Sequence, residues 1–182
     1  MAIFSSRTFS LKSGGIVIVR SALPDDAQAI LDVATSVLAE NQFTLTTVEE
    51  IKGLQQQVER IADMNQAERA IILLAEVDGR AVGAADFRCG TKKRNAHHGD
   101  FGVSVLKPWR DQGVGHALVT TIIDWAAAHP DIEAVRLSVD PTNARAIAVY
   151  RKLGFVDEGV LKRSVKYEDG RYADSLLMRR DV

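Results

Sequence analysis

The stretch Val103–Gly115, VSVLKPWRDQGVG, decides how the rest of the chain is interpreted. A strand-like run leads through Pro108 into a helical pattern, with glycines at 113 and 115 where the helix begins. The first N–H groups of a helix have no intrahelical partner and lie at the positive end of its dipole, so they suit a phosphate or pyrophosphate. Glycine lets this backbone approach the anion, and Arg110 adds charge at the rim. A plain strand-to-helix connection would look the same.

This stretch is not a dinucleotide-binding fingerprint, because the first glycine of G-x-G-x-x-G is missing. The overall charge argues against proteins that bind nucleic acid or an anionic membrane. The 23 Lys and Arg nearly balance the 24 Asp and Glu, and the pI is about 6.4. We therefore expect neither a nucleic-acid partner nor a membrane partner. Cys89 is the single cysteine, which excludes an intrachain disulfide and argues against a cysteine-based metal site; we expect no metal.

Before Val103, the spacing of apolar residues is helical in some segments and strand-like in others. Thr47 and Glu50 have capping-box spacing at the start of a helical stripe. Asp78-Gly79 stands between two strand-like runs, a strong signal for a type I′ hairpin. The predicted elements are strands over 16–20, 70–77 and 80–88 and helices over 24–38 and 48–61.

Patterns after Val103 continue the alternation. We predict strands over 98–106, 134–139, 155–167 and 172–179, and helices over 113–129 and 142–153. The element order is β-α-α-β-β-β-α-β-α-β-β. Helices and hairpins both occur, so the fold class is α/β of the α+β type, with a mixed central sheet in a single domain over 1–182.

The N-terminal segment is not expected to act as a signal peptide. Met1–Gly15 is mixed polar and lacks the apolar run of a signal peptide. No apolar run approaches the length that spans a bilayer. We therefore expect a cytoplasmic protein.

A second segment, after the strand over 134–139, adds to the anion loop. Asn143 precedes the next helix, and Tyr150 shares one face of that helix with Ala146, Ile147 and Leu153. One interpretation makes Asn143 a helix cap and Tyr150 a core aromatic. The other places the phenol in a cleft between strands, where it can donate a proton to a departing thiolate.

Together the two segments resemble the GNAT superfamily of acetyl-CoA-dependent N-acetyltransferases. The resemblance covers residues 16–178 and is most specific over 103–155. It implies two adjacent parallel strands that splay apart to hold the CoA. The residues that carry it are Arg110-x-x-Gly113-x-Gly115 and Asn143-x-x-Ala146-x-x-x-Tyr150-x-x-x-Gly154-Phe155.

The resemblance also assigns the cofactor site. Backbone amides of the loop Arg110–Gly115 would hold the CoA pyrophosphate, and the preceding strand would lie along the pantetheine. Asn143 would form a hydrogen bond with the pantetheine or with a group beside it. The residues so assigned are Val103, Ser104, Val105, Arg110, Asp111, Gln112, Gly113, Val114, Gly115, His116 and Asn143.

The implied mechanism is direct attack of a neutral amine on the thioester in a ternary complex. Tyr150 would act as general acid to the CoA thiolate, and the N–H of Val105 would stabilise the oxyanion. Cys89 is not needed as a nucleophile. The acceptor of the amine proton is left open, although Asp100 is taken as a catalytic residue. The candidates are Asp100, His97, His98, Glu40 and a water chain.

Substrate selection is expected to fall to the Val37–Thr46 link and to the C-terminal hairpin, where Asp174 should reach the cleft. The hairpin sequence is similar to that of members acting on small amines, which suggests an amino acid, a polyamine or a xenobiotic amine. The alternatives are a protein or peptide N-acetyltransferase and a non-catalytic acyl-CoA-binding regulatory module. The resemblance also implies a homodimer.

Overall fold

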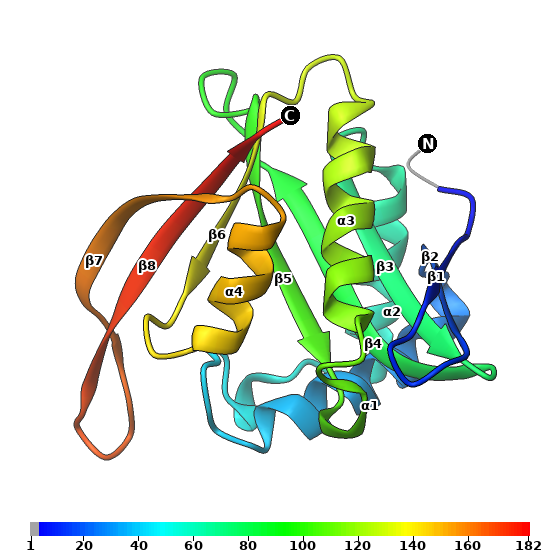
Figure 1. Cartoon of the computed structure of the whole chain (residues 1–182), viewed down its shortest axis with the longest axis horizontal. Coiled ribbons are helices and arrows are strands. Elements are labelled where there is room, and N and C mark those ends of the chain that lie inside the picture. The colour runs from blue at the N-terminus through cyan, green and yellow to red at the C-terminus, as the bar shows by residue number, and fades with distance from the viewer. Residues whose placement is uncertain (1–3) are drawn as a thin grey trace.

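An eight-stranded sheet forms the centre of the computed structural model, which describes residues 4–182 (Figure 1). Its spatial order is β1-β2-β3-β4-β5-β6-β8-β7. The strands are β1 Arg7–Ser10, β2 Ile16–Ser21, β3 Ala70–Val77, β4 Arg80–Cys89, β5 His98–Val105, β6 Ala134–Val139, β7 Val156–Lys166 and β8 Tyr172–Asp181. The helices are α1 Ala27–Leu38, α2 Leu54–Gln66, α3 Val114–Ala127 and α4 Ala144–Lys152, with short 3₁₀ turns η1 Pro24–Asp26, η2 Val48–Glu50 and η3 Lys107–Trp109.

Helices cover both faces of the sheet. In Figure 1, α3 and α4 lie in front of it and α1 and α2 behind it. The larger apolar cluster joins α3 to the central strands and includes Leu118 and Ile122, both fully buried. A smaller cluster around Ile61 and Met64 fixes α2 on the opposite face. None of the helices within residues 4–182 is long and apolar enough to cross a membrane.

The mixed sheet predicted from the sequence is confirmed. Every strand pair between residues 4 and 182 is antiparallel except β5 with β6. The Asp78-Gly79 hairpin is also confirmed, because both residues have positive φ (49° and 72°), as a type I′ turn requires. The long β7–β8 hairpin projects at the far edge (Figure 1).

The strand β1 was absent from the predicted order. It has four residues and pairs antiparallel with β2, Arg7 opposite Val19. Its side chains alternate between half-buried and exposed, and three of the four are polar. Such a short edge strand has little apolar periodicity to detect.

The predicted start of the second helix was wrong. The capping box exists, since the N–H of Thr47 donates to the Glu50 carboxylate at 2.9 Å. It closes only the η2 turn, because Ile51 then turns to an extended conformation with ψ of 125°. The helix α2 begins at Leu54, behind Gly53. The apolar stripe thus ran across two separate elements.

Candidate active site

The parallel pair β5–β6 opens after three residue pairs. His98, Gly99 and Asp100 pair with 134–136 of β6. Beyond Asp100, β5 continues only with β4, and β6 continues only with β8. Two strands that begin as hydrogen-bonded neighbours therefore diverge and leave a gap in the middle of the sheet.

The open edge of β5 presents unpaired backbone groups to this gap. The N–H of Leu106 donates to the carbonyl of Val82 at 3.0 Å, and the N–H of Gly90 donates to His98 at 3.1 Å. Antiparallel ladders alternate between bonded and non-bonded pairs. The N–H groups of Val103 and Val105 therefore face away from β4, toward the gap.

The loop after β5 forms an anion cradle. Gly113 caps α3 with φ of +106°, a conformation in which side chains are strained. The first N–H bonded within the helix belongs to Ala117, which donates to Gly113 at 2.9 Å. The N–H groups of Val114, Gly115 and His116 precede it and have no intrahelical acceptor. Their position at the positive helix end suits a pyrophosphate.

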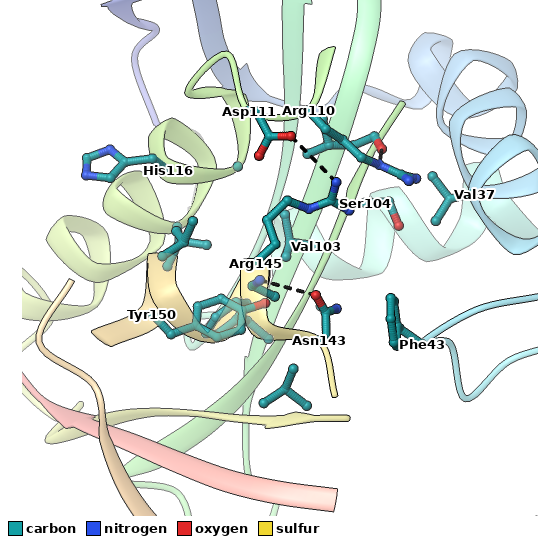
Figure 2. Close-up of a pocket in the computed structure, with 18 of the residues that line it drawn as sticks. Val37, Phe43, Val103, Ser104, Arg110, Asp111, His116, Asn143, Arg145 and Tyr150 are labelled. Atoms are coloured by element: carbon teal, nitrogen blue, oxygen red, sulfur yellow. Dashed lines mark hydrogen bonds and ion pairs between the residues drawn. The ribbon is translucent and has the colours of Figure 1, made fainter. Parts of the chain in front are cut away.

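A cleft of about 800 Å³ passes through the gap and over the cradle (Figure 2). Its walls come from β5, the cradle, the start of α3, the end of β6 with α4, the link after α1, and the β1–β2 turn. Figure 2 shows Val37 and Phe43 on one side of it and Asn143, Arg145 and Tyr150 on the other. The cleft thus runs from the cradle to the part lined by the Val37–Thr46 link, which we call the chamber.

Most of the residues assigned from the sequence meet in this cleft. Val114 does not line it, because its side chain is fully buried in the core. Asp100 does not line it either. The assigned residues that do are Val103, Ser104, Val105, Arg110, Asp111, Gln112, Gly113, Gly115, His116, Asn143 and Tyr150.

Tyr150 stands at the wall of the cleft on α4. Its ring packs edge-on against Phe101 at 5.7 Å and against Phe155 at 5.9 Å between centroids. Burial raises the pKa of Tyr150 to about 12. The phenol is therefore protonated at neutral pH, as a proton donor must be.

Asn143 both caps a helix and lines the cleft, so the structural and the functional interpretations of this residue hold together. Its side-chain oxygen accepts a hydrogen bond from the N–H of Ala146 at 3.2 Å and caps α4. The residue also lines the cleft. The cap occupies the oxygen, so the NH₂ group is what Asn143 can offer a ligand.

Arg110 does not supply the free rim charge that we expected. Its guanidinium donates to both oxygens of Glu40 at 2.7 and 2.5 Å and to the carbonyl of Val105 at 2.9 Å. This partner also lowers the pKa of Glu40, chiefly through the hydrogen bonds. A carboxylate held in this way is a poor proton acceptor, which removes Glu40 from the candidate bases.

The remaining candidate bases lie outside the cleft wall. Burial, and next the charge of Arg136, lowers the pKa of His98, whose Nδ1 is buried without a hydrogen-bond partner among residues 4–182. His97 stacks edge-on with it at 4.8 Å between centroids, and neither ring lines the cleft. Asp100 shares a strand face with Gly102, a lining residue, and is about 7 Å further along β5.

The expectation that Asp174 reaches the cleft was wrong. Its carboxylate pairs with Lys162 at 2.8 Å and accepts the N–H of Arg163 at 2.8 Å. Arg163 has a positive φ of 52° within an irregular stretch of β7, so Asp174 serves to hold the hairpin. Residues of the β7–β8 hairpin are absent from the cleft lining within 4–182, whereas the Val37–Thr46 link is well represented.

Sequence reasoning missed several contributors to the cleft, among them the N-terminal hairpin and Arg145. The β1–β2 turn brings Phe9, Ser10 and Lys12 to the cradle. Arg145 on α4 faces Asp111 at 3.7 Å across the mouth (Figure 2). Arg145 lies inside the Asn143-x-x-Ala146 motif and could have been suspected, but no local signal marks Lys12. Within residues 4–182 no three His, Cys, Asp or Glu side chains cluster as a metal site would need.

The site combines three features: splayed parallel strands, an anion cradle at a helix start, and a buried phenol beside the gap. This combination is typical of acyl-transfer enzymes that hold a phosphate-bearing donor within the sheet. The model of the family described as "Acetyltransferase (GNAT) family" matches residues 37–155. The chain belongs to this family, and it is an N-acetyltransferase by class.

Individual relatives agree with this membership. The chain is similar to the L-amino acid N-acetyltransferase AaaT of Escherichia coli, 34% identical over 122 residues, which cover 67% of this chain and 73% of the relative. It is 28% identical over 177 residues to the N-alpha-acetyltransferase of Sulfurisphaera tokodaii, covering 92% and 94%. Among solved structures, a GNAT-family acetyltransferase from Streptococcus pneumoniae superimposes with a TM-score of 0.87, 27% identity and coverage of 91% and 99%.

Proposed function

We propose that this protein transfers the acetyl group of acetyl-CoA to the primary amine of a small molecule, with an amino acid as the preferred acceptor class. The observation that carries the proposal is the cleft, which joins the cradle to the chamber through the gap between β5 and β6. A donor with a pyrophosphate at one end and a thioester at the other fits such a path.

The cradle matches the anionic part of that donor. The unbonded N–H groups of Val114, Gly115 and His116 would hold the pyrophosphate, and the NH₂ of Asn143 would bond the pantetheine. The open edge of β5 at Val103 would bond one of its amides in place of the missing strand, which leaves the N–H of Val105 for the reacting end of the donor. Bound in this way, the donor supplies an activated acetyl group as a thioester.

Two groups would act on the reacting atoms. The N–H of Val105 would donate to the carbonyl oxygen, where negative charge develops. Tyr150 would give its proton to the sulfur that leaves, since its raised pKa keeps the phenol protonated until then. The amine attacks directly, so no side chain needs to carry the acetyl group.

The amine must lose a proton before it attacks. We propose that water in the chamber passes this proton to Asp100, which is exposed on the same face of β5 as the lining residue Gly102. Asp100→Asn should then lower kcat/KM at neutral pH, with the loss shrinking at high pH where the amine is already neutral. Asp131→Asn, an exposed site outside the cleft, is the control.

The chamber supports an amino acid over a polyamine. Glu40 and Asp111 are the acidic residues of the lining within 4–182, and each faces an arginine. A polycation would need free carboxylates. The apolar residues Val37, Phe43 and Leu45 instead suit an uncharged side chain. The similarity to an L-amino acid N-acetyltransferase supports the same class.

Acetylation of a protein N-terminus is the second candidate, because the chain aligns along almost its full length with an N-alpha-acetyltransferase. Both reactions use the same cradle and phenol. They differ in whether the chamber accepts a free carboxylate next to the amine or a peptide chain.

The test is thiol release from acetyl-CoA with a panel of amino acids, polyamines and N-terminal peptides, with product masses measured. We expect N-acetylated amino acids, and Tyr150→Phe should lower kcat about 10²-fold or more. Acetylated peptides alone would favour the second candidate. Full activity of Tyr150→Phe would remove Tyr150 as the acid but leave the fold assignment intact. The homodimer and the cytoplasmic location stay predictions, to be checked by light scattering and by fractionation.

A further inference from the structure

The β1–β2 turn is docked on the cradle. Residues 11–15 form a tight turn. The N–H of Leu11 donates to the carbonyl of Gly15 at 3.1 Å, and the N–H of Gly14 donates to the carbonyl of Leu11 at 3.2 Å. The N–H of Lys12 donates to the carbonyl of Gln112 at 3.0 Å. Leu11 anchors the turn in the main apolar cluster, only 6% exposed. The backbone of Lys12 is thus held one residue away from Gly113.

Lys12 lies beside the cradle, at the wall of the cleft. Lys12 lines it together with Gln112, Gly113 and Gly115. Within residues 4–182 no carboxylate oxygen lies within 4 Å of its ammonium group. The residue is exposed, so the ammonium can reach a ligand that lies in the cradle.

Two other cations near the cradle each face a carboxylate. Arg110 is engaged by both oxygens of Glu40. Arg145 faces Asp111 at 3.7 Å. Lys152 also lines the cleft, but it is seven residues beyond Arg145 on α4, about 10 Å along the helix. Lys12 is therefore a cation of the cleft that is held beside Gly113 and that faces no carboxylate within residues 4–182.

We propose that Lys12 is a ligand of the cofactor pyrophosphate, contributed by the N-terminal hairpin and forming one wall of the cofactor site. This inference rests on the proposed acetyl-CoA site. Lys12 lies outside the residues 37–155 that match the family model, so the family pattern does not supply it. The strand β1, which the sequence pattern did not reveal, would then have the functional task of carrying this lysine.

Calorimetric titration with CoA tests the assignment in the full-length protein. Lys12→Ala should weaken binding roughly tenfold, as loss of one charge-assisted hydrogen bond does, and Lys12→Arg should restore most of it. Lys93→Ala, an exposed lysine outside the cleft, should match the wild type. In turnover, Lys12→Ala should raise KM for acetyl-CoA while kcat stays unchanged.

Titration with dephospho-CoA, which keeps the pyrophosphate and lacks the 3′-phosphate, identifies the partner. The same loss with both ligands supports the pyrophosphate contact, whereas a loss seen only with CoA overturns it. Equal affinities of the wild type and Lys12→Ala would also overturn it while leaving the proposed function standing. If the wild type binds no CoA, the proposed function fails and takes the Lys12 assignment with it. Unchanged thermal unfolding of the variants confirms that the exposed substitution leaves the fold intact.

Discussion

The carboxylate of Glu40 and the guanidinium of Arg110 form a two-pronged ion pair, with N–O distances of 2.7 and 2.5 Å, that ties the end of α1 to the cofactor loop. The two side chains are only 27% and 17% exposed. Arg110 also donates to Val105, the residue whose N–H faces the gap. One arginine thus links the residue after α1, the cradle and the edge of β5.

Glu40→Gln should lower the free energy of unfolding by about 1–3 kcal/mol at pH 7, because it leaves a partly buried arginine without its counter-charge. The lowered pKa of Glu40 means that its contribution is complete above the ordinary value of 4.5 and is lost as pH falls below it. Urea unfolding of wild type and variant should therefore differ most at pH 7 and converge toward pH 3.

The control is Asp157→Asn, which breaks the exposed pair with Arg151 and should cost less than about 1 kcal/mol. A gap between wild type and Glu40→Gln that is equally large at pH 3 would show that the charge pair is not its cause.

Tyr150 should leave a signature in alkaline stability. Its pKa is about 12 in the folded protein against 10 for a free phenol. Between these two pH values the folded state therefore keeps a proton that the unfolded state has lost. This stabilisation is complete below pH 10 and is lost as pH rises toward 12. Tyr150→Phe should make the decline of stability over this range less steep, by up to about 2–3 kcal/mol in total.

Denaturant unfolding at pH 9, 10 and 11 measures this slope. Tyr172→Phe, at a ring that is 46% exposed, should keep the wild-type slope. Identical slopes for Tyr150→Phe and wild type would contradict the raised pKa of the buried phenol.

The two glycines of the cradle should respond oppositely to alanine. Gly113 has φ of +106°, so Gly113→Ala should cost about 1–3 kcal/mol and displace the amides that follow. A Cβ at Gly115 would meet only Val105 at 3.8 Å, an ordinary contact inside a helix. Gly115→Ala should therefore keep or slightly raise stability. Thermal unfolding with CoA titration distinguishes them, and equal losses in both variants would contradict the distinction.

The elements with strong local signals were predictable from the sequence. The Asp78-Gly79 turn and the short strand run Ala134–Val139 are both recognisable from a few neighbouring residues. The strand β1 and the start of α2 were not predictable, because both depend on contacts with residues that are distant in the sequence or on the conformation of Ile51. Four weakly patterned residues become a strand only when β2 offers an edge, and the Thr47 capping box fits a single turn as well as a full helix.

The candidate site divides in the same way. The cradle glycines and Tyr150 lie in motifs whose spacing is visible along the chain, and the structure brings them to one cleft. The Glu40–Arg110 pair joins residues 70 positions apart, and Lys12 reaches Gln112 over 100 positions. Such partnerships depend on the assembled sheet. For this reason Arg110 was expected to be a free rim charge, and Glu40 was counted among the bases.

Cys89 should be dispensable for transfer. It is 6% exposed, and burial raises the pKa of its thiol to about 11, so little thiolate exists at neutral pH. Cys89→Ala should keep kcat within about twofold of the wild type, and acetyl-CoA without an amine should leave the intact protein mass unchanged. A stable acetyl adduct that disappears in Cys89→Ala would contradict direct attack.

Initial rates over a matrix of acetyl-CoA and amino acid concentrations, with thiol and N-acetyl product both quantified, test the central claim most directly. Both substrates must occupy one cleft for the amine to reach the thioester, so we predict intersecting double-reciprocal lines and one N-acetyl product per thiol released. Parallel lines, typical of a covalent acyl-enzyme, or tight CoA binding with no product from any amine, would contradict the account.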